Sequence, residues 1–303
     1  MNDVIRIGTR DSKLALWQAN HAKSKFEKLN IPVEIIKIKS EGDLNQITPL
    51  YEFGVTGIFT KNLDRALLNN EIDVAVHSLK DVPIKPAEGV KIGCVFKRAN
   101  PYDVLVLKNK EIDFSQKLII ATSSIRRKCQ WLNKYPNHKI EILRGNVDTR
   151  LQKLKTNNWD GAIFAQAGIE RLELNIKELL LLEWMIPSAA QGTIALATRE
   201  KDDALKKILE KISCNDTMHC VTQERMFLKL MGGGCSMPIS AHAYFNERRL
   251  ILKTNICSID YKKSITDISE YKKNDKDAGL KSYNKIFKKG ANNCLLYTSD
   301  AAD

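Results

Sequence analysis

Residues 73–83 read Asp-Val-Ala-Val-His-Ser-Leu-Lys-Asp-Val-Pro, a short apolar run that stops at a polar cluster. Residues 74–76 are β-branched or small and follow a helix-like segment at 59–68, so they are typical of a buried strand in a parallel sheet. Pro83 is expected to end that strand. The polar cluster then lies at or just beyond the carboxyl end of a strand, which is where open α/β sheets bind their ligands.

Lys80 and Asp81 are the members of this cluster that can do chemistry. A lysine beside a carboxylate can bind an anion and move a proton. The alternative is a solvated loop with a surface ion pair, which is a common and weak feature. The rest of the chain decides between these two interpretations.

The composition is that of a folded protein with two or three domains. The chain has 303 residues, of which 43% are hydrophobic and 28% are charged, as in ordinary globular proteins. No apolar run reaches membrane-spanning length, and the first ten residues lack a signal-peptide core. Seven scattered cysteines, an odd number, fit a reducing compartment. We therefore expect the protein in the cytoplasm, with no membrane partner.

Two ligand classes are disfavoured by the pattern of charged and metal-binding residues. The net charge is +12, but the basic residues are spread out and carry no aromatic-interleaved motif, so no nucleic acid is expected. Cys214, His219 and Cys220 offer three metal ligands without a fourth nearby, so no metal is expected.

Of the 48 basic residues only 13 are arginine. Arginine is therefore expected where a carboxylate or phosphate is held by two parallel hydrogen bonds.

One arrangement recurs along the chain: a strand, a polar turn with arginine, and a helix. The first strand, at 4–8, is followed by Arg10 and Ser12 at a helix start, which is a natural anion site. For the helix that follows residues 122–124, the alternative is a surface helix with basic residues. The later repeats place their polar residues at Thr122, Ser124, Arg126 and Arg127, at Arg144 and Arg150, and at Arg171.

The order of these segments predicts two lobes joined by two crossovers. Residues 97–101 lead from the first lobe to the second, and the loop at 187–192, which includes Gln191, leads back into a strand at 193–198. A small third domain should hold a sheet at 240–260 and a final helix at 280–289. The expected boundaries are 1–96 with 193–212 for lobe 1, 101–190 for lobe 2, 216–293 for the C-terminal domain, and 294–303 for an appended or misread tail.

Two loops have distinct chemistry. Residues 40–56 combine glycine and proline without periodicity, which predicts a long mobile loop over the site. Residues 231–238 place three glycines before Cys235, and an accessible thiol of this kind can act as a nucleophile. The alternative is an incidental loop cysteine. The glycine run is not a phosphate-binding P-loop, because no Gly-Lys-Ser or Gly-Lys-Thr follows.

Seven segments between Arg6 and about residue 290 closely resemble the hydroxymethylbilane synthase family, also called porphobilinogen deaminases. These segments are RIGTRDSKLALWQA, DVAVHSLKDVP, ATSSIRRKCQW, LRGNVDTRL, AQAGIERL, AAQGTIALATRE and GGGCSMPIS. The resemblance implies an α/β fold with two lobes like those of periplasmic binding proteins, a cleft between them, and a small α/β C-terminal domain. It also implies a monomer.

By the same resemblance, the enzyme adds four porphobilinogen molecules head to tail, each losing ammonia, to give linear hydroxymethylbilane for tetrapyrrole biosynthesis. A dipyrromethane cofactor would be joined to Cys235 by a thioether and lie in the cleft. The residues that match positions binding substrate and cofactor carboxylates are Arg10, Ser12, Lys80, Thr122, Ser124, Arg126, Arg127, Arg144, Arg150, Arg171 and Gln191.

Asp81 matches the family's catalytic carboxylate, and its chemistry suits the reaction. The leaving amine needs a proton, the azafulvene cation that forms needs a nearby anion, and the pyrrole must later lose a proton. Thr56 departs from the family pattern, in which many members have lysine, and this departure puts a lid contact to substrate in question.

The main alternative is a non-catalytic, two-lobed protein that binds a polycarboxylate; nucleic-acid binding ranks third. The binding-protein hypothesis explains the arginines but gives Cys235 and Asp81 no role. A covalent dipyrrole would add to the mass of the intact chain, which neither alternative predicts.

Overall fold

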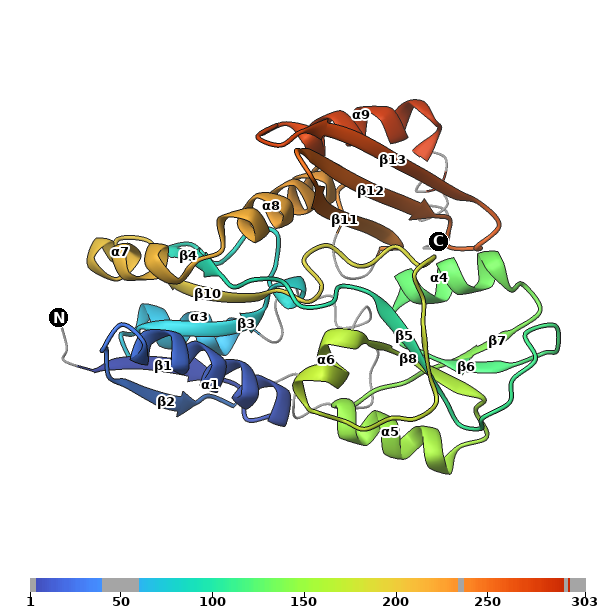
Figure 1. Cartoon of the computed structure of the whole chain (residues 1–303), viewed down its shortest axis with the longest axis horizontal. Coiled ribbons are helices and arrows are strands. Elements are labelled where there is room, and N and C mark those ends of the chain that lie inside the picture. The colour runs from blue at the N-terminus through green and yellow to red at the C-terminus, as the bar shows by residue number, and fades with distance from the viewer. Residues whose placement is uncertain (1–3, 40–59, 234–236, 292–293, 295–303) are drawn as a thin grey trace, which may run out of the picture.

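In the part of the chain that the structure describes, two five-stranded sheets and one three-stranded sheet form the framework (Figure 1). The computed structural model describes residues 4–39, 60–233, 237–291 and 294. The expected fold class, two α/β lobes with a small third domain, is confirmed by this arrangement. The exact domain boundaries stay a prediction.

The sheet of lobe 1 has the strand order β2-β1-β3-β10-β4. Its strands are β1 (Ile5–Thr9), β2 (Val33–Lys37), β3 (Val74–Ser78), β4 (Val90–Val95) and β10 (Ile194–Arg199). β3 runs parallel to β1 but antiparallel to β10, so the sheet is mixed rather than parallel as expected. Because β10 lies between β3 and β4, the chain returns to lobe 1 after building lobe 2.

Among the described residues, lobe 1 also has three helices: α1 (Lys13–Glu27), α3 (Lys61–Leu68) and α7 (Asp203–Ile212). α1 and α7 bury apolar side chains, among them Phe26 and Leu209, with Val74 of β3 in one core. Val74 and its neighbours are buried on both faces of the sheet, which is why their sequence reads as a continuous apolar run.

The end of β3 differs from the sequence prediction in one detail. The strand ends at Ser78 rather than at Pro83, and a single 3₁₀ turn, η2 (Leu79–Asp81), follows it. The backbone N–H of Leu79 donates to the carbonyl of Thr193 at 2.9 Å. The turn that carries Lys80 and Asp81 is therefore fixed to the start of β10.

Lobe 2 repeats the plan with the strand order β7-β6-β8-β5-β9. Its strands are β5 (Asp103–Leu107), β6 (Ile119–Ala121), β7 (Lys139–Glu141), β8 (Gly161–Ala165) and β9 (Leu179–Leu181). Its helices are α4 (Ile125–Lys134), α5 (Val147–Thr156) and α6 (Gln166–Arg171). The side chains of Ser124 and Asn146 cap α4 and α5, as helix-start sequences predict.

The third domain is an antiparallel sheet of β11 (Ile239–Asn246), β12 (Arg249–Cys257) and β13 (Ser264–Lys272), packed against α8 (Asn215–Leu230) and α9 (Ala278–Lys288). The prediction that this sheet ends at Asp260 is wrong, because β13 extends it to Lys272. Cys294, which the sequence interpretation placed in the tail, is buried in the same core as Phe227 and Ile286.

Several simple features hold for the residues that the structure describes. None of their helices has the length and apolar character needed to cross a bilayer. None of their His, Cys, Asp and Glu side chains form a group of three or more that could hold a metal ion. The six cysteines among them are free thiols.

Candidate active site

A cavity of about 80 Å³ lies at the carboxyl end of β3, against the start of α1. Arg10, Ser12 and Asp81 line it together, so residues that the sequence placed at two separate strand ends meet at one site. Ser12 caps α1 by accepting a hydrogen bond from the backbone N–H of Ala15 at 3.3 Å. Gln18, which the sequence analysis did not single out, also lines the cavity and donates to Ser78 Oγ at 2.8 Å.

Lys80 links the turn after β3 to the second crossover. Its Nζ donates to Oε1 of Gln191 at 3.3 Å. Burial lowers the pKa of Lys80 to about 8, although the charge of Asp81 opposes that shift. Gln191 in turn donates from Nε2 to Asp103 Oδ1 at 2.9 Å. A chain of contacts thus runs from lobe 1 through the crossover to lobe 2.

Asp103 is a fully buried carboxylate that holds the arginine pair of α4. Its oxygens lie 2.8 Å from Arg126 Nη1 and 2.8 Å from Arg127 Nη2. Burial opposes ionisation of Asp103, but the charges of the two arginines outweigh it and hold the pKa of the carboxyl well below its usual range. Asp103 was missed by sequence reasoning; the available signal was an ionisable residue at the start of an otherwise apolar strand.

The arginine pair is an interior feature and not a basic surface, because Arg126 and Arg127 are only 5% and 6% exposed. Arg127 donates from Nε and Nη2 to Asp103 and from Nη1 to the carbonyl of Ile163 at 2.8 Å. The interpretation of α4 as a surface helix is therefore wrong. Thr122, which is close to these arginines in the sequence, is also buried. Its hydroxyl accepts a hydrogen bond from the backbone N–H of Ser124 at 3.2 Å.

Arg144 and Arg150 come from the loop and helix that follow β7. Gly145, between β7 and α5, has a φ of 111°, a conformation that glycine adopts without strain, and its carbonyl accepts from Arg150 Nε at 2.7 Å. Burial, together with the charges of Arg127 and Arg144, lowers the pKa of Arg150 to about 10. These cations are therefore close enough to repel one another.

Arg171, at the end of α6, bridges the two lobes. Its Nη2 donates to the carbonyl of Gly192 in the second crossover at 2.6 Å, and its guanidinium lies 5.7 Å from the ring centre of Trp17 in α1. Burial lowers its pKa to about 10. This contact set makes Arg171 part of the joint between the lobes.

The charge balance of the site fits a ligand with several carboxylates. Two carboxylates, Asp81 and Asp103, lie among a larger group of buried or half-buried cations, namely Lys80, Arg126, Arg127, Arg144 and Arg150. Buried like charges raise one another's free energy unless anions compensate them. Bound carboxylates would supply that compensation.

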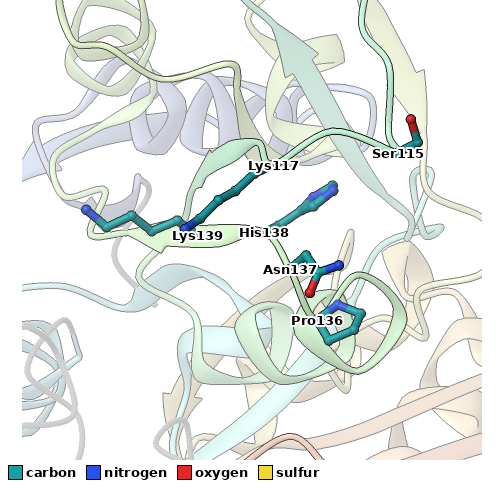
Figure 2. Close-up of a pocket in the computed structure, with 6 residues that line it drawn as sticks. All are labelled: Ser115, Lys117, Pro136, Asn137, His138 and Lys139. Atoms are coloured by element: carbon teal, nitrogen blue, oxygen red, sulfur yellow. The ribbon is translucent and has the colours of Figure 1, made fainter.

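A larger hollow of about 780 Å³ lies elsewhere on lobe 2, around the start of β7 (Figure 2). Its lining residues, which include Lys117, Lys139 and His138, contain none of the predicted site residues. Both ring nitrogens of His138 are engaged, by Trp131 Nε1 at 3.2 Å and by the carbonyl of Phe114 at 3.1 Å. We therefore assign the chemistry to the smaller cavity at β3.

Two predicted residues, Cys235 and Thr56, lie outside the described part of the chain. The roles expected for them, cofactor attachment and a lid contact, stay predictions. The same holds for the expected lid at 40–56.

Comparisons with known proteins show the family to which the chain belongs. Residues 5–207 match the family described as "Porphobilinogen deaminase, dipyromethane cofactor binding domain", and residues 218–288 match its C-terminal domain. The chain is 45% identical to a probable porphobilinogen deaminase of Methanocaldococcus jannaschii, over 82% of this chain and 86% of that protein. It is 39% identical to the porphobilinogen deaminase of Geobacter metallireducens, over 87% and 84% of the two chains.

Similar solved structures include an ancestral cationic amino acid solute binding protein, at 15% identity and a TM-score of 0.45, covering 69% of this chain and 87% of that one. They also include the methionine-binding protein MetQ, at 13% identity and a TM-score of 0.46, covering 71% and 92% of the two chains. The sequence matches cover both lobes and the third domain, and on that basis the chain belongs to the porphobilinogen deaminase family.

Proposed function

We propose that this protein joins four porphobilinogen molecules head to tail into linear hydroxymethylbilane, with release of ammonia, in tetrapyrrole biosynthesis. The observation that carries this proposal is the position of Asp81. Its side chain lines one cavity with Arg10 and Ser12, and its charge acts on two buried cations from lobe 2, Arg127 and Arg150. A proton-transfer group beside a site for carboxylates is what this substrate requires.

The acetate and propionate arms of porphobilinogen give the arginines their task. Arg10, at the start of α1, and Arg144 and Arg150, from lobe 2, would hold those carboxylates from opposite sides. Charge-assisted hydrogen bonds of this kind orient as well as bind. The substrate's amine is then presented to Asp81 in a fixed geometry, which lowers the barrier by removing orientational freedom before reaction.

Asp81 would act in three steps on the bound substrate. It donates a proton to the departing amine, its carboxylate then faces the positive charge left on the substrate, and it finally accepts the proton lost from the pyrrole ring. One carboxylate returns to its starting protonation state after each addition. Lys80, whose pKa is lowered to about 8 by burial, supplies a cation beside it.

The dipyrromethane cofactor of the family, when bound, supplies the pyrrole end to which new units are added. We propose that Cys235 holds it by a thioether. Arg126, Arg127 and Lys80 would then hold its carboxylates. Support comes from the excess of buried cations around Asp81 and Asp103, and from the three glycines that precede Cys235 in the sequence.

We further propose that the protein acts as a monomer in the cytoplasm on a small-molecule substrate, without nucleic acid or membrane. The free thiols of six described cysteines are in keeping with a reducing compartment.

Mass spectrometry of the intact chain tests the covalent attachment. The purified wild type should be heavier than its sequence by one dipyrrole, and Cys235→Ser should fold, lack the added mass and show no activity. Cys214→Ser is the matched control. Cys214 is half-buried and directly precedes α8, and this variant should keep both the added mass and the activity. A full adduct on Cys235→Ser would place the attachment elsewhere.

The activity itself is tested by incubating the wild type with porphobilinogen and measuring ammonia and the linear product. A polycarboxylate-binding protein without catalysis would bind porphobilinogen and release no ammonia.

A further inference from the structure

A single arginine from the third domain contacts the turn that carries the proposed catalytic residues. Arg225, on α8, donates hydrogen bonds to four backbone carbonyls of that turn and the residues after it. The acceptors are Leu79 at 3.4 Å and Val82 at 3.0 Å from Nη1, and Pro83 at 2.6 Å and Ile84 at 3.3 Å from Nη2. Lys80 and Asp81 lie between the first two of these acceptors.

The same face of α8 packs against the turn through apolar side chains. Val221 lies one helical turn before Arg225, at the i, i+4 spacing that puts both side chains on one face. Val221 is buried in a cluster with Leu79 and Val82, and Met218 packs against that cluster. The turn is thus held by apolar contact at Leu79 and by the guanidinium at its carbonyls.

The neighbouring residue on α8 fixes the helix to both crossovers. Glu224 is fully buried and pairs with Arg98, in the first crossover, through both of its oxygens. It also accepts from the backbone N–H of Ala190, in the second crossover, at 2.6 Å. Contacts other than those of Arg225 therefore fix the position of α8. Because the helix is fixed, the guanidinium of Arg225 is held in a defined position relative to the turn.

From this geometry we infer that Arg225 is a positioning residue for the reaction: it holds the Leu79–Asp81 turn so that Asp81 faces the substrate. The inference rests on the proposed function. Guanidinium suits this task because its planar set of donors reaches several acceptors at once, whereas an ammonium group is a compact point charge. The backbone N–H of Leu79 already joins the start of the turn to Thr193. Arg225 adds bonds on the far side of Asp81, at Val82 and Pro83. A displacement of about 1 Å at a reacting group can cost about a hundredfold in rate.

The first measurement needs no substrate. Amide hydrogen exchange is followed in the holoenzyme and in Arg225→Gln, Arg225→Lys and the control Lys229→Gln, an exposed cation on the same helix. In both Arg225 variants the amides of Leu79 and Val82 should exchange about tenfold faster or more, because local opening becomes easier. The amides of α9 and β12 should exchange as in the wild type, and Lys229→Gln should match the wild type throughout.

The second measurement is steady-state turnover of porphobilinogen by the same proteins. Both Arg225 variants should lose about tenfold or more in kcat with KM within about threefold, since the substrate-binding arginines are untouched and the acid-base group is misplaced. Lysine should not rescue the glutamine loss. Should Arg225→Gln fail to fold, Arg225→Lys carries the comparison alone.

The outcomes separate this inference from the proposed function. Unchanged exchange at Leu79 and Val82, or a kcat equal to that of Lys229→Gln, overturns the role of Arg225. A wild type that does not consume porphobilinogen overturns the proposed function instead, and the exchange measurement still decides whether Arg225 holds the turn.

Discussion

The environment of Asp81 explains why its charge matters more than its size. Burial lowers the pKa of Lys80, Arg127 and Arg150, and the charge of Asp81 opposes that shift in all three. Cations of both lobes therefore lie within electrostatic reach of one carboxylate. Removing its charge leaves those cations in place, so binding of substrate carboxylates should survive the loss of catalysis.

Asp81→Asn keeps the side-chain size and removes both the proton and the negative charge. We expect it to fold, to bind porphobilinogen, and to lose at least about a hundredfold in kcat, as for a positioned acid-base group. Asp81→Glu, whose carboxylate is displaced by one methylene, should be slow but measurable. Enzyme-bound intermediates resolved by mass at early times give the comparison, and chain extension by the asparagine variant at the wild-type rate would refute the catalytic assignment.

Arg127 illustrates how a predicted binding residue is also structural. Its guanidinium makes two hydrogen bonds to Asp103 and one to the carbonyl of Ile163. Arg127→Lys keeps the charge but cannot reproduce this planar set, and we expect it to cost on the order of 1 to 3 kcal/mol in the free energy of unfolding and to impair cofactor loading. Urea denaturation measures the first effect and intact mass the second.

The control for that substitution is Arg249→Lys, because Arg249 pairs with Glu270 where both side chains are about half exposed. Exposed pairs contribute little to stability, so this change should stay within about 0.5 kcal/mol. Equal losses in the two variants would mean that the buried geometry of Arg127 has no special weight.

The sequence predicts those site residues whose position follows from nearby residues. Asp81, Arg10 and Ser12 stand at strand ends or helix starts, and the structure brings all three to one cavity. Asp103 and Arg225 were missed. Their partners lie 24 and more than 100 residues away in the chain. The ionisable residue at the start of the apolar strand β5 signals a buried charge at Asp103 but does not identify its partners, and nothing near Arg225 in sequence signals its contacts.

At the level of helices and strands, the same distinction between local and distant information holds. Helix starts at Ser124 and Asn146 were predictable because a capping side chain bonds to a backbone N–H three residues on. The direction of β10 relative to β3 was not, because strand direction in a sheet is set by the connection between the strands. β13 was missed although its exposed and buried residues alternate, since polar residues such as Asp267 and Ser269 occupy its buried side.

The 3₁₀ turn η2 shows why the end of β3 was placed too late. Pro83 is the strand end that the sequence predicts, because proline cannot donate to a sheet, although the apolar run at 74–76 stops earlier. Val82, just before it, is apolar and buried. Val82 is buried outside the strand, in a cluster that combines Val221 of α8 with Val95 of β4. A helix of the third domain thus contributes to the burial of a segment in lobe 1.

For the molecule as a whole, we expect two buried histidines to make stability fall at acid pH. Burial, with the charge of Arg10, lowers the pKa of His77 to about 4. Burial, with the charges of Arg98 and Lys253, lowers that of His242 to about 3. From pH 6.5 down to pH 4 the unfolded chain takes up protons that the folded protein excludes, so stability falls as the pH is lowered through that window.

Each histidine should contribute on the order of 1.4 kcal/mol per pH unit to this loss. Chemical denaturation at pH values between 4 and 6.5 measures the slope. His242 lies in β11, away from the cavity at β3, and His242→Gln removes one titrating group. The free energy of unfolding should then change less with pH, by about 1.4 kcal/mol per pH unit, the contribution of one proton. A slope unchanged by this substitution would assign the acid sensitivity to other groups.

The position of β10 between β3 and β4 has a consequence for how the chain is made. A ribosome delivers β3 and β4 first and β10 only after all of lobe 2, so the facing edges of β3 and β4 emerge with no strand between them. Unpaired strand edges readily join other chains, and domains generally fold as units during synthesis. Lobe 2 can complete its sheet while the chain is still attached to the ribosome. The sheet of lobe 1 stays incomplete until β10 has been made. A chaperone at the ribosomal exit would therefore have to shield the open edges of β3 and β4.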